Sequence, residues 1–358
     1  MLVYIILGFV IGIFALNESG RRTGRDMKMF YIGLFLFLLV VGLHYHTGDY
    51  ETYEMGYNKG IDVGGDKGYY ALQKLFSSTG VSFQFFIFAT TLLSVIAIYL
   101  MYRISIWPSF GLVVILGKFF TLYAMSGIRQ YLAMVVCWWA ISELLLKKRK
   151  VLFILLVLYA YTLHGSAIIV LPVFFLRNLK FSYKTAVLIL GASLIIGLGF
   201  QQFYEQVSGY SDFIDSRFGA YYRQASKAGS EVMNILNYAE NFLFLVFALM
   251  VRNKAIKRIP YYDFFLYMFV IYCGFLIAGS EIGVVKRLRD YYGLAYAFIV
   301  PSFVYLVSRK QERMLIRFVV ILYFIFLMFR SFSVYDSGLR LGANNTMIPY
   351  KSVIELIK

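Results

Sequence analysis

Residues 83–102 read FQFFIFATTLLSVIAIYLMY, an unbroken stretch without one charged side chain. Its length matches the about 20 apolar residues that an α-helix needs to cross a lipid bilayer. Similar apolar runs recur from one end of the chain to the other, and short charged stretches separate them. The pattern therefore predicts an all-α polytopic membrane protein in which residues 1–358 form a single transmembrane domain.

The number and length of these runs indicate about 12 transmembrane helices. Two neighbouring runs, 151–163 and 165–176, are short for a spanning helix, and they fit either broken helices or one re-entrant pair. The other runs cover residues 1–16, 29–46, 83–102, 108–125, 130–146, 185–200, 238–251, 261–280, 291–308 and 316–332.

The composition agrees with a membrane protein. The chain is 60% hydrophobic and only 15% charged, whereas a soluble domain is about 45–50% apolar and about 25% charged. A formal net charge of +16 would suggest nucleic acid as a partner if the protein were soluble. Here the basic residues form short clusters between apolar runs, which is how membrane proteins fix their topology, so we expect no nucleic-acid partner. Cys137 and Cys273 fall inside apolar runs and are expected to be packing residues.

The connections between the runs form two alternating sets with different charge. One set has a large excess of Lys and Arg over Asp and Glu and is expected to be cytoplasmic, whereas the other is balanced and is expected outside. No basic stretch precedes the first run, so we expect an uncleaved first helix, with the N- and C-termini outside. The basic set comprises 17–28, 103–107, 147–150, 177–184, 252–260 and 309–317, and the balanced set 47–82, 126–129, 201–237, 281–290 and 333–358.

Two outer connections, 47–82 and 201–237, are long, while all the inner ones are short. Binding and catalytic residues concentrate in such connections, so we expect the two long outer loops to form the substrate-binding face. No Walker A sequence occurs in the inner connections, and Gly64-Gly65 is interpreted as a pair of turn glycines.

Arginines at the outer ends of predicted helices are candidates for binding an anion. Arg129 lies in the sequence SGIRQ between two apolar runs, and Arg287 and Arg289 lie in a second basic cluster. Guanidinium groups match pairs of phosphate oxygens, so arginines that converge from separate connections suit a pyrophosphate. Snorkelling or an ion pair is the alternative for Arg129. For the second cluster, the alternative is that Arg289 and Asp290 pair with neighbours.

His164 lies at the turn between the two short runs and is followed by Gly165 and Ser166. Imidazole titrates near neutral pH, so His164 is a candidate general base, and a structural histidine at the membrane interface is the alternative. The sequence contains no Gly-x-Ser-x-Gly motif, so a Ser-His-Asp triad is not supported.

The first long outer connection is preceded by two histidines and opens with a dense group of polar and aromatic residues, which read HYHTGDYETY at 44–53. The rings of Tyr50 and Tyr53 together with the carboxylate of Asp49 form the kind of lining that sugars use, and an interfacial aromatic belt is the alternative. A metal site built from His44, His46 and Asp49 is a further alternative, but its spacing is weakly specific.

Several short motifs follow one another along the chain. They are GDYETY at residues 48–53, IRQxxA at 128–133, HGS at 164–166, RxRxY at 287–291 and IPY at 348–350. As an ordered set, they resemble the EpsG/Wzy-like family of bacterial polysaccharide (O-antigen and exopolysaccharide) polymerases.

The resemblance implies a GT-C-like helical bundle in the bacterial cytoplasmic (inner) membrane, with an active site that faces the periplasm or exterior. It implies a metal-independent glycosyltransferase without a cofactor. The substrates would be undecaprenyl-pyrophosphate-linked oligosaccharides surrounded by membrane lipid, with the growing chain as donor and a new repeat unit as acceptor. A partner that regulates chain length is expected from the resemblance alone.

The same resemblance assigns roles to the candidate residues. Arg129, Arg287 and Arg289 would stabilise the pyrophosphate leaving group, and His164 would accept the proton of the acceptor hydroxyl. The residues expected to bind substrate are Asp49, Tyr50, Tyr53, Gln130, Arg217, Arg223 and Tyr291.

Other classes of protein remain open at this point. A lipid-linked oligosaccharide flippase or transporter fits the same number of helices. An O-antigen ligase would use the same donor and the same arginines. A membrane acyltransferase would also use a histidine, but its site should open inward. A metal-dependent glycosyltransferase would use Asp49 and Glu51, and it would lose activity with a chelator.

Overall fold

The computed structural model describes residues 1–45, 47–207, 231–279, 283–338 and 346–356. In these ranges the chain is helical, and its only β-type pairing is one isolated bridge between His44 and Ser352. This confirms the predicted all-α class. The chain divides into two compact units, residues 1–171 with 307–358, and residues 172–306. The single transmembrane domain expected from the sequence stays a prediction.

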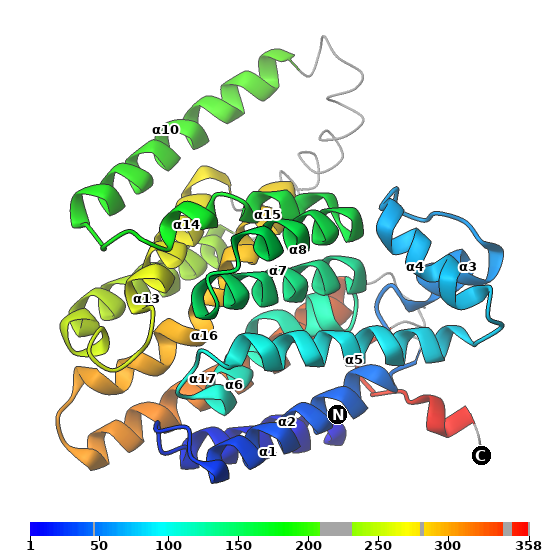
Figure 1. Ribbon diagram of the computed structural model, residues 1–358, viewed down its shortest axis with the longest axis horizontal. Helices are drawn as coiled ribbons and strands as arrows, with labels where there is room; N and C mark the ends of the chain where they lie inside the picture. The colour runs from blue at the N-terminus through cyan, green and yellow to red at the C-terminus, as the bar shows by residue number, and fades with distance from the viewer. Residues whose placement is uncertain (46, 208–230, 280–282, 339–345, 357–358) are drawn as a thin grey trace. The chain divides into compact units, whose positions relative to one another are not determined.

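The first unit contains most of the long helices (Figure 1). Its elements are α1 (Leu2–Asn17), α2 (Gly24–Gly42), α3 (Tyr50–Lys59), α4 (Lys67–Ser77), α5 (Phe83–Tyr102), α6 (Pro108–Phe119), the π-helical turn η1 (Phe120–Ala124), α7 (Ile128–Leu146), α8 (Lys150–Leu163), η2 (Gly165–Val170), α17 (Lys310–Gly338) and η6 (Val353–Leu356). Helices α6 and α7 form its core, because almost every residue of α6 and most of α7 are buried.

The second unit is built around α14 (Tyr262–Gly279), most of whose side chains are buried. Small residues allow α10 (Tyr183–Val207) to approach it closely, since a Cβ on Gly274 would lie 2.5 Å from the hydroxyl of Ser193. The remaining elements are α9 (Val173–Leu176), α13 (Glu231–Ala255), α15 (Gly283–Tyr292), η4 (Gly293–Ala295), α16 (Tyr296–Ile299) and η5 (Val300–Leu306).

Every predicted apolar run overlaps helical segments of the described chain. Four of these helices are long and apolar enough to cross a membrane, namely Phe83–Tyr102, Ile235–Ala255, Tyr262–Gly279 and Lys310–Asp336. The number of about 12 spanning helices stays a prediction. Of the two short runs, the first is the regular helix α8, whereas the second is broken into the 3₁₀ helix η2 and the short α9.

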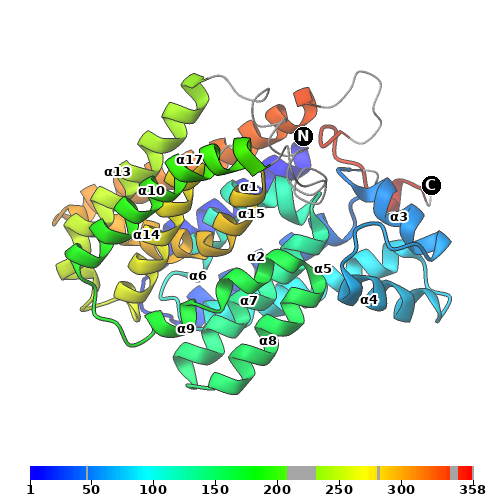
Figure 2. The same cartoon turned by 90° about the horizontal axis from the view of Figure 1, so that it is seen from above.

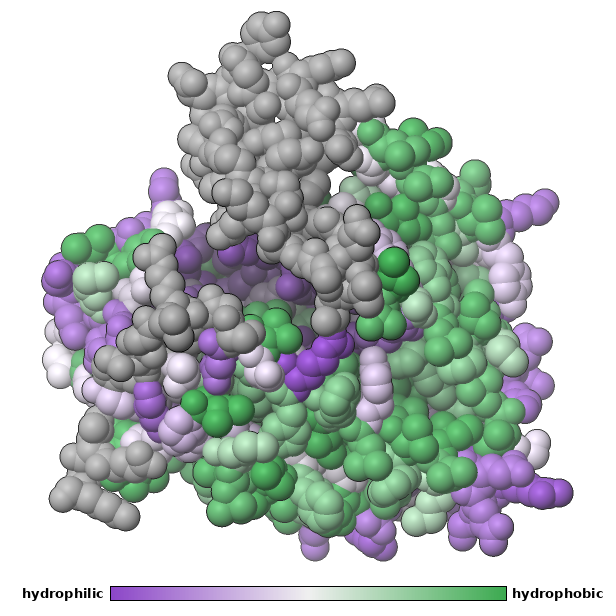
Figure 3. Space-filling model, turned by 180° about the vertical axis from the view of Figure 1, so that it is seen from behind, coloured by the Kyte–Doolittle hydropathy of each residue, from purple (hydrophilic) through white to green (hydrophobic). Residues whose placement is uncertain are grey.

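The exposed faces of the helices are rich in large apolar side chains, such as Phe9, Phe35 and Leu155. The face drawn in Figure 3 carries broad hydrophobic areas, with hydrophilic residues at its right and lower edges and also in its middle and left part. In water such a surface would be costly, whereas lipid tails cover it without penalty.

In the first unit, connections assigned to one side by charge contact one another or the adjoining helix ends. On the basic side, the backbone N–H groups of Ser109 and Phe110 donate to the Glu18 carboxyl at 2.5 and 3.0 Å, and the Arg317 guanidinium donates to the Glu18 carbonyl at 2.6 Å. Burial raises the pKa of the Glu18 carboxyl to about 8, against the opposing effect of those two donors. At the other end of the helices, Tyr4 donates to the carbonyl of Met347 at 3.0 Å.

The first long outer connection is a helical hairpin rather than an irregular loop. Helices α3 and α4 lie next to each other at one end of α5 (Figures 1 and 2). Gly60 ends α3 in a left-handed conformation, with φ of 64°, which a side chain would disfavour. The hairpin is anchored by aromatic packing, for example between Tyr69 and Phe86, whose ring centroids are 5.8 Å apart. In the second long connection, residues 208–230 lie outside the described ranges.

Candidate active site

Arg129 forms an ion pair with a residue of the hairpin. It lies in the first turn of α7, and its Nη1 is 2.7 Å from Oδ2 of Asp66, which precedes α4. The two side chains are only 20% and 15% exposed. A charge-assisted hydrogen bond with this degree of shielding is stronger than an exposed surface pair. The ion-pair alternative for Arg129 is therefore present, with a partner that the sequence pattern does not reveal.

Two further contacts hold the Arg129 guanidinium. Its Nε donates to the hydroxyl of Tyr53 at 3.4 Å, and its Cζ lies 5.5 Å from the centre of the Tyr53 ring. On another side it meets the hairpin backbone, because a Cβ on Gly64 would lie 1.4 Å from Nη1. Glycine is thus required at position 64 for this arginine conformation. Asp62 shapes the turn by accepting hydrogen bonds from Gly64 and Gly65.

The turn that carries His164 meets the same aspartate. The Gly165 N–H donates to Oδ1 of Asp66 at 3.4 Å. Close by, a Cβ on Gly68 would lie 2.1 Å from the hydroxyl of Thr162, so the hairpin packs directly onto the end of α8. The structure therefore gathers Arg129, Tyr53 and the His164 turn around Asp66, and we call this set the Arg129 group. Its members come from α3, α7, the start of α4 and the turn before η2.

Hydrogen bonding of His164 defines how its ring nitrogens are used. Its Nδ1 lies 2.6 Å from the Ser166 hydroxyl and also accepts from the Ser166 N–H at 3.4 Å. A backbone N–H can only donate, so Nδ1 is the acceptor in this second contact. A proton acceptor at this position would therefore be Nδ1.

Three further predicted binding residues lie in the same unit. Tyr50 is buried, and its hydroxyl donates to the Gln84 side chain at 3.0 Å. Gln130 is buried as well. Asp49 precedes α3 directly after Gly48, whose φ of 61° and close approach to Ser126 leave no room for a side chain. Tyr50 and Gln130 are thus buried, whereas the side chain of Asp49 is exposed.

The second arginine cluster lies in the other unit and is arranged differently. Arg289 is buried, with its Nη2 2.9 Å and its Nε 3.0 Å from Oδ1 of Asp290, and its Cζ lies 4.9 Å from the centre of the Tyr272 ring. Arg287 is exposed, and Tyr291 is buried. The charge of Arg289 is therefore already compensated, as the ion-pair alternative anticipated. Arg217 and Arg223 lie outside the described residues.

Within the described ranges, no three His, Cys, Asp or Glu side chains are grouped in a way that could hold a metal ion. His44 is fully buried, and its Nδ1 contacts the carbonyl oxygen of Val41. His46 is outside the described residues.

The apolar helices and the shielded arginine group at one end of them define a multi-pass membrane protein. The model of the EpsG family matches residues 27–352, so the chain belongs to the EpsG family. This confirms the resemblance found in the motifs and indicates a glycosyltransferase-like membrane protein of the polysaccharide-polymerase type. No curated protein and no solved structure matches the chain.

Asp66 and Gly64 are the site residues that sequence reasoning missed. The sequence predicts Gly64 and Gly65 to be turn glycines, and Gly65 does occupy a turn with φ of 71°. Gly64 has a second role, the close approach to Arg129. This role depends on the contact in space between residues 64–66 and Arg129. Because these residues are far apart in the chain, the sequence alone does not show the contact.

Proposed function

We propose that this protein polymerises a polysaccharide by joining undecaprenyl-pyrophosphate-linked oligosaccharide repeat units at the outer leaflet of the bacterial inner membrane. The supporting observation is the Arg129 group in a chain of the EpsG family, with its guanidinium held by Asp66 and Tyr53 beneath the α3–α4 hairpin. Both termini and the Arg129 group lie outside in this proposal, as the charge of the connections predicts.

The reaction is a displacement at the anomeric carbon of the donor. The acceptor hydroxyl forms the new glycosidic bond, and the bond between that carbon and the lipid pyrophosphate breaks. The pyrophosphate leaves with additional negative charge, which a guanidinium positioned in advance stabilises. The lipid pyrophosphate supplies the activation, so the proposal requires neither a nucleotide nor a metal ion.

Arg129 retains a donor for the departing phosphate. Asp66 occupies Nη1 and Tyr53 occupies Nε. Within the described part of the chain, Nη2 of Arg129 has no hydrogen-bond partner, and it can donate to a phosphate oxygen. Asp66 then acts as a positioning residue, because it fixes the plane of the guanidinium without using all of its donors.

His164 is the proposed acceptor of the hydroxyl proton through Nδ1. The Ser166 hydroxyl lies 2.6 Å from that nitrogen, and we propose that the acceptor sugar hydroxyl takes its place. Arg287 and Arg289 are proposed as further pyrophosphate ligands, with Arg217 and Arg223 in the second long connection as additional candidates. A chain-length regulator is the proposed protein partner.

The test uses purified protein and synthetic undecaprenyl-pyrophosphate-linked repeat units, with EDTA present and without nucleotide sugar. Wild type should produce a ladder of longer glycans, and Arg129→Ala should abolish it. Arg21→Ala is the matched control, because this exposed arginine lies in an inner connection, and it should leave the ladder intact. Movement of the lipid across liposomes without any ladder would instead indicate a flippase, and a single transfer to a lipid A core acceptor would indicate a ligase.

A further inference from the structure

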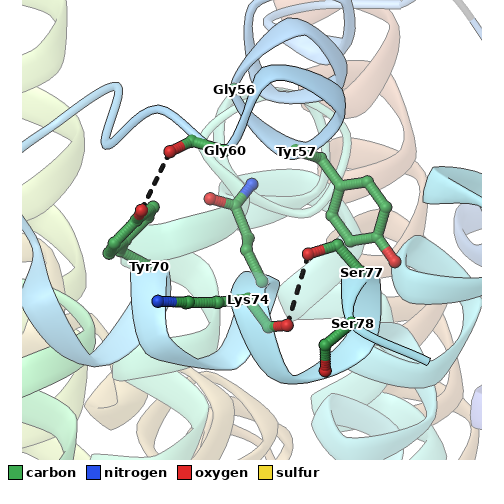
Figure 4. A pocket seen from close by; sticks show the side chains of 8 residues that line it. Gly56, Tyr57, Gly60, Tyr70, Lys74, Ser77 and Ser78 are labelled. Carbon is green, nitrogen blue, oxygen red and sulfur yellow. Dashed lines mark hydrogen bonds between the residues drawn. The ribbon is translucent and has the colours of Figure 1, made fainter. Parts of the chain in front are cut away.

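The hairpin contains a cleft that is separate from the contacts of Arg129. It has a volume of about 310 Å³ and lies between α3 and α4 (Figure 4). Pockets of a few hundred cubic ångströms are large enough to receive a small ligand or part of a larger one. The lining residues are Gly56, Tyr57, Gly60, Tyr70, Gln73, Lys74, Ser77 and Ser78.

Two tyrosine rings of the cleft are fixed before any ligand arrives. The Tyr70 hydroxyl donates to the carbonyl of Gly60 at 2.8 Å, and the Tyr57 hydroxyl donates to the carbonyl of Val81 at 2.9 Å. Tyr57 also packs against Phe83, with ring centroids 5.5 Å apart. Tyr57 is buried, whereas Tyr70 is half-buried, so the fixed ring of Tyr70 offers contact area at a low cost in conformational entropy.

The α4 side of the cleft presents polar groups on one helical face. Tyr70, Lys74 and Ser77 are spaced four and three residues apart, so they project from the same side of the helix. Glycines occupy the opposing side, and Gly56 is packed so tightly that a Cβ there would lie 2.3 Å from Cγ2 of Val63. Lys74 is exposed and is the one charged side chain among the lining residues.

We infer that this cleft is a glycan subsite that binds a sugar ring carrying a carboxylate. Serine hydroxyls suit the hydroxyls of a sugar, a fixed tyrosine ring suits its apolar face, and the ammonium group of Lys74 suits an anionic substituent. This inference rests on the proposed function and specifies which part of the substrate the hairpin binds.

The cleft is linked to the Arg129 group through the backbone of α4. The Tyr70 N–H donates to the Asp66 carbonyl at 3.0 Å, so the tyrosine of the cleft lies one helical turn from the aspartate that holds Arg129. The Gln73 amide also donates to the Tyr53 carbonyl, although the bond is long at 3.5 Å. A glycan whose pyrophosphate contacts Arg129 would thus extend along the hairpin and place a later sugar in the cleft.

The test measures binding of a glycan that has neither lipid nor pyrophosphate. The probe is the single repeat unit cut from the polysaccharide of the host cell, and its partner is the same oligosaccharide after chemical reduction of the carboxylates to alcohols. Full-length protein in nanodiscs should bind the acidic probe, and reduction should weaken binding about two- to fivefold, as expected for a partly exposed charge pair.

Two variants distinguish the contribution of the Lys74 charge to binding from that of the Tyr70 ring. Lys74→Gln should weaken binding of the acidic probe to the level of the reduced probe, and it should leave binding of the reduced probe unchanged. Tyr70→Ala should weaken binding of both. Lys59→Gln, which changes an exposed lysine of α3 outside the lining, should alter neither. Equal binding of both probes by wild type, or an unchanged preference in Lys74→Gln, overturns the inference.

The experiment also distinguishes this inference from the proposed function. Arg129→Ala should still bind the free oligosaccharide while it fails to extend lipid-linked units. A wild type that polymerises but does not bind the acidic probe disproves the subsite alone. A wild type that binds the probe through Lys74 but forms no polymer supports the subsite and disproves the polymerase.

Discussion

Gly64→Ala should strongly lower the activity of the protein through Arg129 while leaving the fold intact. The new methyl carbon would lie 1.4 Å from Nη1 and 2.2 Å from Cζ of Arg129, so the guanidinium must move. The backbone at position 64 tolerates alanine, because its φ is not in the left-handed region. The clash therefore falls on a flexible side chain, and the ion pair with Asp66 is lost.

The size of the effect follows from the bonds that are broken. A hydrogen bond to a charged group contributes about 1.5–3 kcal/mol. Arg129 and Asp66 are mostly shielded from solvent, so this range needs little reduction for screening. If the same geometry serves the transition state, the loss in kcat/KM for the lipid-linked donor is about 10- to 100-fold.

Initial rates of glycan extension measure this loss, with Gly65→Ala as the neighbouring control. Gly65 has φ of 71°, and a Cβ at this position would meet no described atom within 4 Å, so alanine there strains the backbone without touching the arginine. Gly65→Ala should lower the melting temperature more than Gly64→Ala but retain more activity. Wild-type rates for Gly64→Ala, or equal losses in the two variants, would refute the role of the Arg129 position.

Three further outcomes are expected. Asp66→Asn should lower kcat about 10-fold without raising the KM for the donor. The reason is that Arg129 keeps its charge but loses the carboxylate that orients it. Steady-state kinetics over a range of donor concentrations checks this prediction. Arg289→Ala should lower the melting temperature strongly, since loss of a buried partner costs about 3–5 kcal/mol. Arg287→Ala, which changes an exposed residue, should not lower it. A higher melting temperature for Arg289→Ala would contradict the buried pair. The Glu18 carboxyl has a folded pKa of about 8, above its ordinary value of 4.5, so the folded state binds more protons between these values and the stability should fall as pH rises from 5 to 8. Melting curves of Glu18→Gln should show a smaller fall over that interval, and an equal fall in both proteins would exclude Glu18 as the cause.

The helices of the membrane region could be predicted from the sequence because their signal is local. A run such as 83–102 must be helical in lipid, where each backbone group needs a partner within the segment. The hairpin at 47–82 gave no such signal. Its helices are short and polar, and their stability comes from packing of Tyr57 and Tyr69 onto Phe83 and Phe86 of α5, which no periodicity reveals.

The candidate site could be predicted only where its signal is local in the sequence. Arg129 was identifiable because a charge at the start of an apolar helix needs a partner or a purpose. Its partner Asp66 is 63 residues away, so the ion pair exists only through the fold. The pair between Arg289 and Asp290 could be anticipated, since the two residues are adjacent in the chain.

The ion pair of Arg129 is compatible with the anion-binding role that we propose for it. An arginine that served only to neutralise Asp66 could use any conformation in which the two charges meet, and it would not require glycine at position 64. Here the guanidinium is fixed by Asp66, Tyr53 and the Gly64 backbone at once, yet its Nη2 has no partner among the residues that the structure describes. Such a fixed and incompletely used donor group is what stabilisation of a departing phosphate requires, because the group does not have to reorganise when the charge develops.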